Sequence, residues 1–92
     1  MEKYSVDLTP RAKEQLRLIY KSGDKVIIKK IERLVVELSE HPKIGIGKPE
    51  QLKGVENTWS RRLDKKNRLV YTIKEEKILV LVLSVLGHYA DK

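Results

Sequence analysis

The fold is decided by the stretch TWSRRLDKKNRLVYTIKEEKILVLVLSVL, residues 58–86. It holds three runs rich in aliphatic, aromatic and β-branched residues, and such runs predict strands. We expect these strands at 58–63, 68–74 and 77–86. The joints between them, DKKN at 64–67 and the pair Glu75-Glu76, are too short for anything but antiparallel neighbours. The run ILVLVL at 78–83 is apolar on both faces, which indicates a central strand of this antiparallel meander.

The chain before this stretch predicts one strand and a helical hairpin. Residues 4–8 alternate between apolar and polar, which is typical of a strand with one buried face. Thr9 and Pro10 supply a helix N-cap and a favoured first helical position, and this helix should end near Gly23. Asp24 can cap a second helix with a broad apolar stripe, which should stop at His41 and Pro42.

These elements together predict an α+β fold with the order βααβββ. The two helices should pack on one face of the sheet and leave the other face partly open. Residues 43–57 have no periodic pattern and contain Gly and Pro, so we expect a loop there, and loops held by rigid elements often carry function. With 92 residues, the chain should form a single domain over 1–92.

The composition narrows the class of protein. There is no cysteine, so disulfides and thiolate metal sites do not contribute, which suits a reducing compartment such as the bacterial cytoplasm. The first residues lack the apolar segment of a signal peptide, and the longest apolar run, 78–83, is far too short to cross a bilayer. We therefore expect a soluble, cytoplasmic protein with no membrane partner.

The charge of the chain is positive and unevenly distributed. The net charge is +7, and residues 43–71 contain eight basic and three acidic side chains, so most of the excess lies in one third of the chain. A concentrated positive field attracts polyanions and speeds their encounter. A basic run is also a common feature of plain solvated surfaces, so charge alone leaves nucleic acid and an ordinary surface as alternatives.

Three residue types in the second half of the chain match the needs of RNA cleavage through the 2′-hydroxyl. That reaction needs a base, an acid for the leaving 5′-oxygen, and cations for the charge that grows on phosphorus. Glu50 is the only carboxylate in residues 43–55, and His88 lies next to Tyr89, which could stack on a base. Taken singly, a glutamate in a loop and a histidine after a strand are more often ordinary surface residues.

Three arginines lie on two strands that we expect to pair. Arg61, Arg62 and Arg68 could approach one another across the ladder, and a phosphate would relieve their mutual repulsion. The alternative is that they pair with nearby surface carboxylates. Trp59 and Tyr71 fall in apolar alternating strands and are expected in the core.

The sequence lacks the residues that other reaction chemistries need. Metal-dependent nucleases gather carboxylates around one or two ions, and the basic region has no paired acidic motif. The two histidines stand far apart, there is no cysteine, and no G-x-S-x-G occurs. We therefore expect neither a metal nor a cofactor.

Four short stretches occur in one order along the chain: GKPEQLK at 47–53, WSRRL at 59–63, RLVY at 68–71 and HY at 88–89. They follow KKIERLV at 29–35. In this combination the chain resembles the YoeB/Txe toxins of the RelE superfamily, which are ribosome-dependent mRNA interferases of bacterial type II toxin–antitoxin pairs. The resemblance runs nearly from end to end and implies a RelE-like, microbial RNase-type fold.

The resemblance also implies roles for single residues. By this likeness Glu50 is the general base, His88 is the general acid, and Arg68 stabilises the pentacovalent phosphate. The reaction would be metal-independent cleavage of mRNA in the ribosomal A site, giving a 2′,3′-cyclic phosphate and a 5′-hydroxyl. The residues expected to bind RNA are Lys48, Lys53, Arg61, Arg62 and Tyr89.

The implied partners are the ribosome with its mRNA and a cognate antitoxin of the YefM/Axe type, whose acidic C-terminal segment would cover the basic groove. A homodimer is also possible for such a chain. Two other functions stay open: a non-catalytic inhibitor of the ParE type, and an RNA-binding module whose charges only hold phosphate. An inhibitor would have no need of Glu50, Arg68 and His88 together. In a binding module, removal of Glu50 would leave function intact or strengthen binding.

Overall fold

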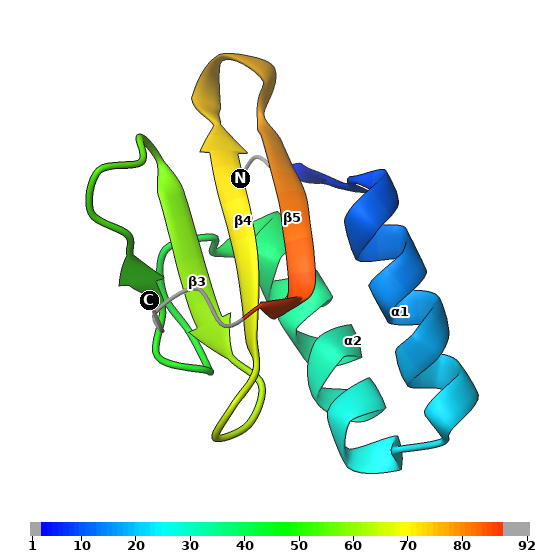
Figure 1. Ribbon diagram of the computed structural model, residues 1–92. Coiled ribbons are helices and arrows are strands. Elements are labelled where there is room, and N and C mark those ends of the chain that lie inside the picture. The colour runs from blue at the N-terminus through cyan, green and yellow to red at the C-terminus, as the bar shows by residue number, and fades with distance from the viewer. Residues whose placement is uncertain (1–2, 88–92) are drawn as a thin grey trace.

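The computed structural model describes residues 3–87 of the chain, and all structural statements below concern this part. It is a sheet with two helices on one side (Figure 1). The elements in chain order are β1 (Ser5–Leu8), α1 (Pro10–Ser22), α2 (Lys25–Glu40), β2 (Glu50–Gln51), β3 (Thr58–Arg62), β4 (Arg68–Lys74), the 3-10 helix η1 (Glu75–Lys77) and β5 (Leu79–Gly87). The predicted α+β order is confirmed.

The sheet has the strand order β1-β5-β4-β3-β2. The last three strands form the predicted antiparallel meander, with Trp59 opposite Tyr71 and Tyr71 opposite Val82. β1 pairs with β5 in parallel, with Val6 opposite Val80. β5 therefore has a strand on each side, and its position inside the sheet explains why it is apolar on both faces.

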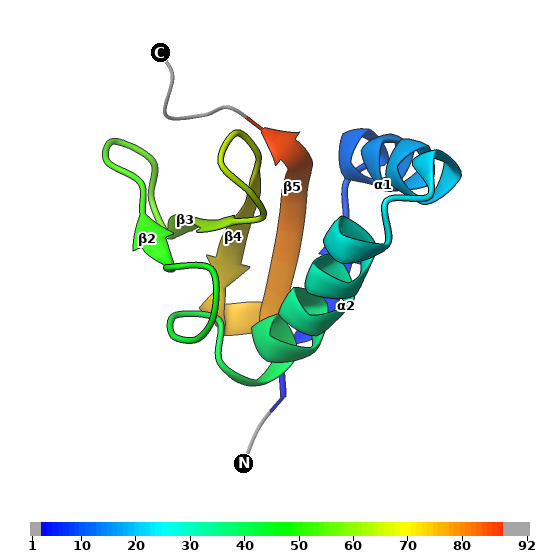
Figure 2. The ribbon, with the colours of Figure 1, turned by 90° about the horizontal axis from the view of Figure 1, so that it is seen from below.

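The helices begin and end at the residues that the sequence predicts. The Thr9 side chain accepts a hydrogen bond from Ala12 N–H, and Pro10 occupies the first turn of α1. Gly23 ends α1 in the left-handed conformation, with φ 76°, and Asp24 caps α2 through Ile27 N–H. This connection makes a hairpin whose two helices lie on the same side of the sheet, as Figure 2 shows. Within residues 3–87, the other face of the sheet carries no helix.

The core lies between the helices and the sheet. Side chains of α1 and α2 pack against the inward-facing side chains of β3, β4 and β5. The fully buried large residues include Leu34, Leu38, Leu69, Tyr71, Ile73, Val80 and Val82. Tyr71 is fully buried and Trp59 is partly buried against the same cluster, which confirms that both aromatic residues belong to the core.

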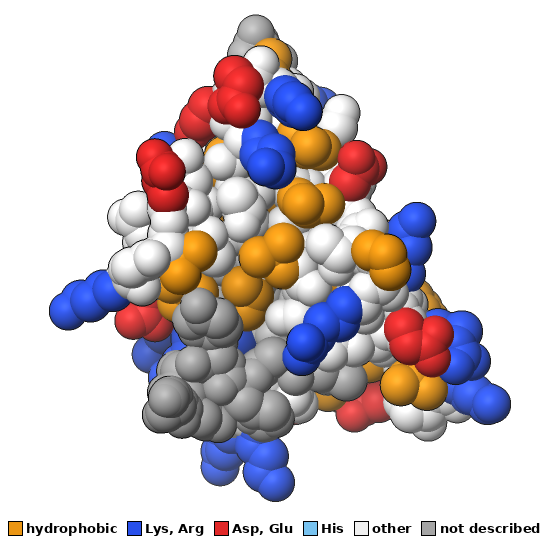
Figure 3. Space-filling view, turned by 45° about the horizontal axis from the view of Figure 1, so that its top comes forward, with side chains coloured by type: hydrophobic (Ala, Val, Ile, Leu, Met, Phe, Trp, Pro, Cys, Tyr) orange, Lys and Arg blue, Asp and Glu red, His pale blue; other side chains and the backbone are white. Residues whose placement is uncertain are grey.

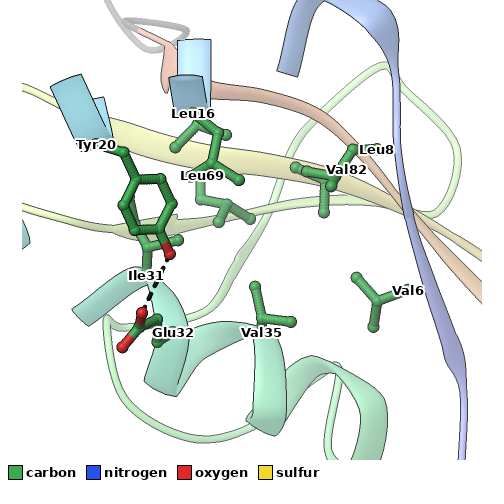
Figure 4. A pocket seen from close by; sticks show the side chains of 10 residues that line it. Val6, Leu8, Leu16, Tyr20, Ile31, Glu32, Val35, Leu69 and Val82 are labelled. Carbon is green, nitrogen blue, oxygen red and sulfur yellow. Dashed lines mark hydrogen bonds between the residues drawn. The ribbon is translucent and has the colours of Figure 1, made fainter. Parts of the chain in front are cut away.

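An apolar cavity of about 300 Å³ remains between the two helices and the sheet. Figure 4 shows Val6, Leu16, Val35 and Val82 around it. At one side, Tyr20 Oη donates a hydrogen bond of 3.1 Å to Glu32 Oε2 and links α1 to α2. The helices thus approach the sheet without filling all the space between them.

Two elements differ from the sequence expectation. The loop predicted over 43–57 contains β2, a strand of two residues that pairs antiparallel with β3. The joint between β4 and β5 is longer than expected, because Glu75–Lys77 form a 3-10 turn and Ile78 adopts a left-handed conformation with φ 49°. No helix within residues 3–87 is long and apolar enough to cross a membrane.

Candidate active site and RNA interface

The β2–β3–β4 ladder brings the predicted base and the predicted phosphate-binding arginine onto one face of the sheet. Glu50 lies opposite Ser60, and Arg62 lies opposite Arg68. Because side chains alternate along a strand, Ser60 and Arg62 share a face, and their cross-strand partners share it with them. This is the face that carries no helix.

Arg68 is the centre of the contacts on this face. Its Nη1 atom lies 3.4 Å from Glu50 Oε1 and 3.3 Å from Ser60 Oγ. The Arg68 side chain is 19% exposed and that of Glu50 is 66% exposed. An ion pair this open to water is worth about 0–1 kcal/mol, so an incoming phosphate can compete for the guanidinium. A carboxylate therefore lies within reach of the group that would hold the phosphate.

The end of β5 comes to the same place. Gly87 pairs with Arg68, and the register between β4 and β5 shifts around Val70. Such shifts mark a β-bulge or another irregularity of the ladder, and bulges are common beside active sites because they change the direction of a side chain. Gly87 precedes His88 in the chain, and the predicted acid His88 and the predicted stacking residue Tyr89 both lie outside the described residues.

Three basic residues of the predicted RNA-binding set are exposed near this site. Lys48 and Lys53 lie before and after β2, and Arg62 lies across the ladder from Arg68. Lys48 adopts a left-handed backbone with φ 49°, and such strained positions occur often in functional loops. Figure 3 shows hydrophobic side chains over the middle of the helix-free face, with Lys and Arg as well as Asp and Glu side chains around them. The exposed cations Lys48, Lys53 and Arg62 lie close to Glu50 or Arg68 in the chain or in the sheet.

Arg61 does not belong to this surface, and its prediction as an RNA-binding residue needs correction. The residue is 0% exposed and points to the opposite face from Arg62. Its guanidinium donates to Glu37 Oε1 and to backbone carbonyls of the loop that follows α2. Side-chain alternation along β3 puts Arg61 and Arg62 on opposite faces, but it does not show that this loop covers Arg61.

Two residues that contact the predicted arginines were not assigned a role from the sequence. Ser60 is fully buried, and its hydroxyl accepts a hydrogen bond from Arg68. Its place between Trp59 and Arg61 already predicted the same face as Arg62, so the alternation of the strand could have identified it. Glu37 had no such signal, because a glutamate near the end of a helix is usually a solvated residue.

Burial and the Arg61 guanidinium together shift the pKa values of Glu37 and Tyr71. Partial burial by itself raises the pKa of the Glu37 carboxyl, but the Ile46 N–H and the Arg61 guanidinium outweigh this effect, so the pKa lies below its ordinary value. Burial raises the pKa of the Tyr71 phenol, against the opposite influence of Arg61. Glu37 is thus an ionised acceptor and Tyr71 a neutral donor near neutral pH.

Within residues 3–87 there is no group of three or more His, Cys, Asp or Glu side chains that could hold a metal ion. Glu50 has Arg68, rather than a second carboxylate, as its charged neighbour.

Comparison with known proteins adds the family. The sequence model of the YoeB-like toxins of bacterial type II toxin–antitoxin systems matches residues 9–89. The chain is 40% identical to a protein named Toxin YoeB from Synechocystis, over 78% of this chain and 83% of that protein.

Solved structures show the same similarity. The YoeB dimer from Staphylococcus aureus has a TM-score of 0.80 and 32% identity, and the match covers 94% of this chain and 98% of that one. A heterotetrameric YoeB–YefM toxin–antitoxin complex from the same organism matches with a TM-score of 0.77, 32% identity and the same coverage. Fold and sequence thus agree on one group of relatives.

Proposed function

Because the chain belongs to the family of YoeB-like toxins of bacterial type II toxin–antitoxin systems, we propose that it is a metal-independent endoribonuclease that cleaves mRNA in the ribosomal A site. The observation that carries the proposal is the contact between Glu50 and Arg68 on the helix-free face of the sheet. A binding module would have no use for a carboxylate at this point, because it would repel the phosphate.

In the proposed reaction, Glu50 removes the proton of the 2′-hydroxyl, and the 2′-oxygen attacks the adjacent phosphorus. The bond from phosphorus to the 5′-oxygen breaks, and His88 gives its proton to that oxygen. The products are a 2′,3′-cyclic phosphate and a 5′-hydroxyl. The step involves no oxidation or reduction and consumes no water. One residue that accepts a proton and one that donates a proton are therefore enough.

Arg68 stabilises the negative charge that develops on the phosphate oxygens. A guanidinium keeps its charge at all physiological pH values and matches phosphate geometry through paired hydrogen bonds. The half-buried position of Arg68 and its bond to Ser60 Oγ limit the directions in which the guanidinium can point. A preorganised cation of this kind stabilises charge at little reorganisation cost.

Lys48, Lys53 and Arg62 are proposed to hold the mRNA backbone, and Tyr89 is proposed to stack on a base. The three cations are exposed around Glu50 and Arg68. Base stacking on an aromatic side chain is worth about 1–3 kcal/mol in proteins that bind single strands. Arg61 has no part in this interface, because its guanidinium is buried.

The proposed partner that neutralises the toxin is an antitoxin of the YefM type. The similarity to a YoeB–YefM complex supports this assignment. The net charge of +7 on this chain favours the binding of an acidic antitoxin segment. The similarity to a YoeB dimer makes self-association a second proposal, which a sedimentation measurement on the purified chain can test.

The test of the proposed function is cleavage of mRNA on programmed ribosomes, with the cut mapped by primer extension. We expect wild-type protein to cut within the A-site codon, and Glu50→Ala, Arg68→Ala and His88→Ala to lose the cut. Binding of the variants to ribosomes should persist, since most of the basic surface remains. If wild-type protein binds ribosomes or gyrase without cutting RNA, the chain is an inhibitor and the proposed reaction is wrong.

A further inference from the structure

The connection from α2 to β2 lies over a buried arginine. We propose that Arg61, Glu37 and Tyr71 form a clamp that sets the position of Glu50, so that they are positioning residues for RNA cleavage. This inference rests on the function proposed above, because it assigns the clamp an effect on the reaction. Its structural part, that the clamp holds the connection in place, can be tested without RNA.

Arg61 supplies most of the bonds of the clamp. Its Nη2 donates to the carbonyl oxygens of His41 and Ile44, the latter at 2.9 Å, and its Nη1 donates to that of Ile46 at 3.3 Å. Nη1 also lies 2.7 Å from Glu37 Oε1. One guanidinium therefore joins the end of α2 to three points along the connection. A lysine has neither the planar geometry nor the number of donors to make these bonds together.

Glu37 and Tyr71 complete the clamp from two other elements. Glu37 Oε1 accepts a hydrogen bond of 3.0 Å from Ile46 N–H in addition to the one from Arg61. Tyr71 Oη accepts from Arg61 Nε at 3.2 Å and donates to the carbonyl of Pro42 at 2.6 Å. The connection is thus held from α2, β3 and β4 at once.

The backbone of the connection comes so close to these groups that glycine is required. At Gly45, with φ 132°, a Cβ atom would clash with the Glu37 carboxylate. At Gly47, with φ 81°, it would lie 3.2 Å from Arg61 Cβ and 3.0 Å from the backbone carbonyl oxygen of Arg62. Two glycines that permit such an approach indicate that the connection is built against the clamp.

The clamp reaches Glu50 through a short and restrained piece of chain. The carbonyl of Gly47 accepts a hydrogen bond of 2.7 Å from Arg62 N–H, and Pro49 has a fixed φ. Glu50 then begins β2, which has only two residues and pairs with β3. So short a ladder gives limited support, so the clamped connection on its N-terminal side contributes to where the Glu50 carboxylate points.

The first experiment measures hydrogen exchange of the full-length chain. Tyr71→Phe keeps the buried ring and removes the hydroxyl that bonds to Arg61 and Pro42. We expect faster exchange at the amides of Ile46 and Arg62, with protection retained in β5. The matched control is Tyr20→Phe, which removes the hydroxyl that joins α1 to Glu32 of α2 by a hydrogen bond. It should leave the exchange rates of the Ile46 and Arg62 amides unchanged. Unchanged exchange at Ile46 and Arg62 in Tyr71→Phe would refute the clamp, whatever the activity.

The second experiment asks whether the clamp acts through Glu50. We expect Tyr71→Phe to lower kcat on programmed ribosomes by about 10- to 100-fold, because small misplacements of a catalytic group have effects of this size. KM should change little. In the Glu50→Gln background, Tyr71→Phe should lower the residual rate no further, since residues that act as a unit are not additive.

The outcomes separate the clamp from the proposed function. If the reductions in cleavage rate caused by the two substitutions multiply in the double variant, Tyr71 acts independently of Glu50 and the positioning role is wrong. If Glu50→Gln cleaves as wild type does, Glu50 is not the base, and if wild-type protein does not cleave, the proposed function is wrong. In both cases the exchange result still decides whether the clamp exists. Should Tyr71→Phe fail to fold, Glu37→Gln takes its place, because it keeps an acceptor for Ile46 N–H but removes the charge that faces Arg61.

Discussion

Arg68 and Glu50 are in contact across the helix-free face of the sheet, with Arg68 Nη1 3.4 Å from Glu50 Oε1. They come from β4 and β2, which are separated by β3 in the sheet. The contact is long and open to water, so it costs little to break. A phosphate that binds Arg68 would therefore free Glu50 for proton transfer. Substrate binding would replace the contact between Arg68 and Glu50 by contacts of each residue with the RNA.

Replacement of Glu50 tests its proposed role as the base. We expect Glu50→Gln to lower the cleavage rate by about 10²–10⁴-fold, as is typical when a general base is lost, with RNA binding unchanged or stronger. Glu56→Gln removes the same charge at another exposed position after β2 and should cleave as wild type does. Primer extension and a filter-binding measurement decide the matter, and loss of binding in Glu50→Gln alone would contradict the prediction.

The Ser60 hydroxyl should orient Arg68. We expect Ser60→Ala to reduce cleavage about fivefold, because a hydrogen bond of roughly 1 kcal/mol to the guanidinium is lost. Thr72→Val is the matched control, since the Thr72 hydroxyl bonds to Thr58 rather than to the site. Single-turnover cleavage rates give the comparison. Equal losses in both variants would show that the effect comes from the sheet and not from Arg68.

The neighbours Arg61 and Arg62 should differ sharply in their effect on stability. We expect Arg61→Met to lower the free energy of unfolding by about 3–5 kcal/mol, because it breaks a buried ion pair and leaves loop carbonyls without donors. Arg62→Met changes an exposed side chain and should stay within about 0.5 kcal/mol of wild type. Urea denaturation measures both variants, and similar losses would contradict the burial of Arg61.

The Glu37 carboxylate should make stability depend on acid pH. Its pKa is lower in the folded protein than its ordinary value, so its contribution is present above the unfolded pKa and is lost as the pH falls through the folded pKa. We expect the free energy of unfolding to fall between about pH 5 and pH 3, and to fall less steeply in Glu37→Gln. Urea titrations across this range measure it. A Glu37→Gln curve parallel to that of wild type would show that Glu37 is not the group responsible.

Filling the cavity between the helices and the sheet should stabilise the fold. Val35 lines this cavity, while its neighbour Val36 is 59% exposed on the same helix. Both Val35→Leu and Val36→Leu remove a β-branched residue from α2. The difference between their effects on the free energy of unfolding therefore isolates the effect of the cavity. We expect Val35→Leu to raise the free energy of unfolding by about 0.5–1 kcal/mol more than Val36→Leu. A greater gain from Val36→Leu would mean that the added methylene is not accommodated.

The sequence by itself determined the two helices and the four longer strands of this protein. Thr9 and Asp24 cap the two helices, and the short joints after β3 and β4 require an antiparallel meander, so the local signals were sufficient. The sequence also singled out Glu50, the only carboxylate in residues 43–55. These features depend on neighbours in the chain and on the spacing of apolar residues, which can be read along one strand or one helix.

Only the tertiary structure decided which side chains meet. The contact between Glu50 and Arg68 requires the pairing of β2, a strand of two residues that no pattern indicated. The burial of Arg61 depends on the path of the loop after α2, which covers one face of β3 and satisfies the guanidinium with its carbonyls. Strand alternation shows that Arg61 and Arg62 point in opposite directions, but not which direction leads to solvent. That choice is made by segments distant in the chain, because a buried charge is stable only where the fold supplies its partners.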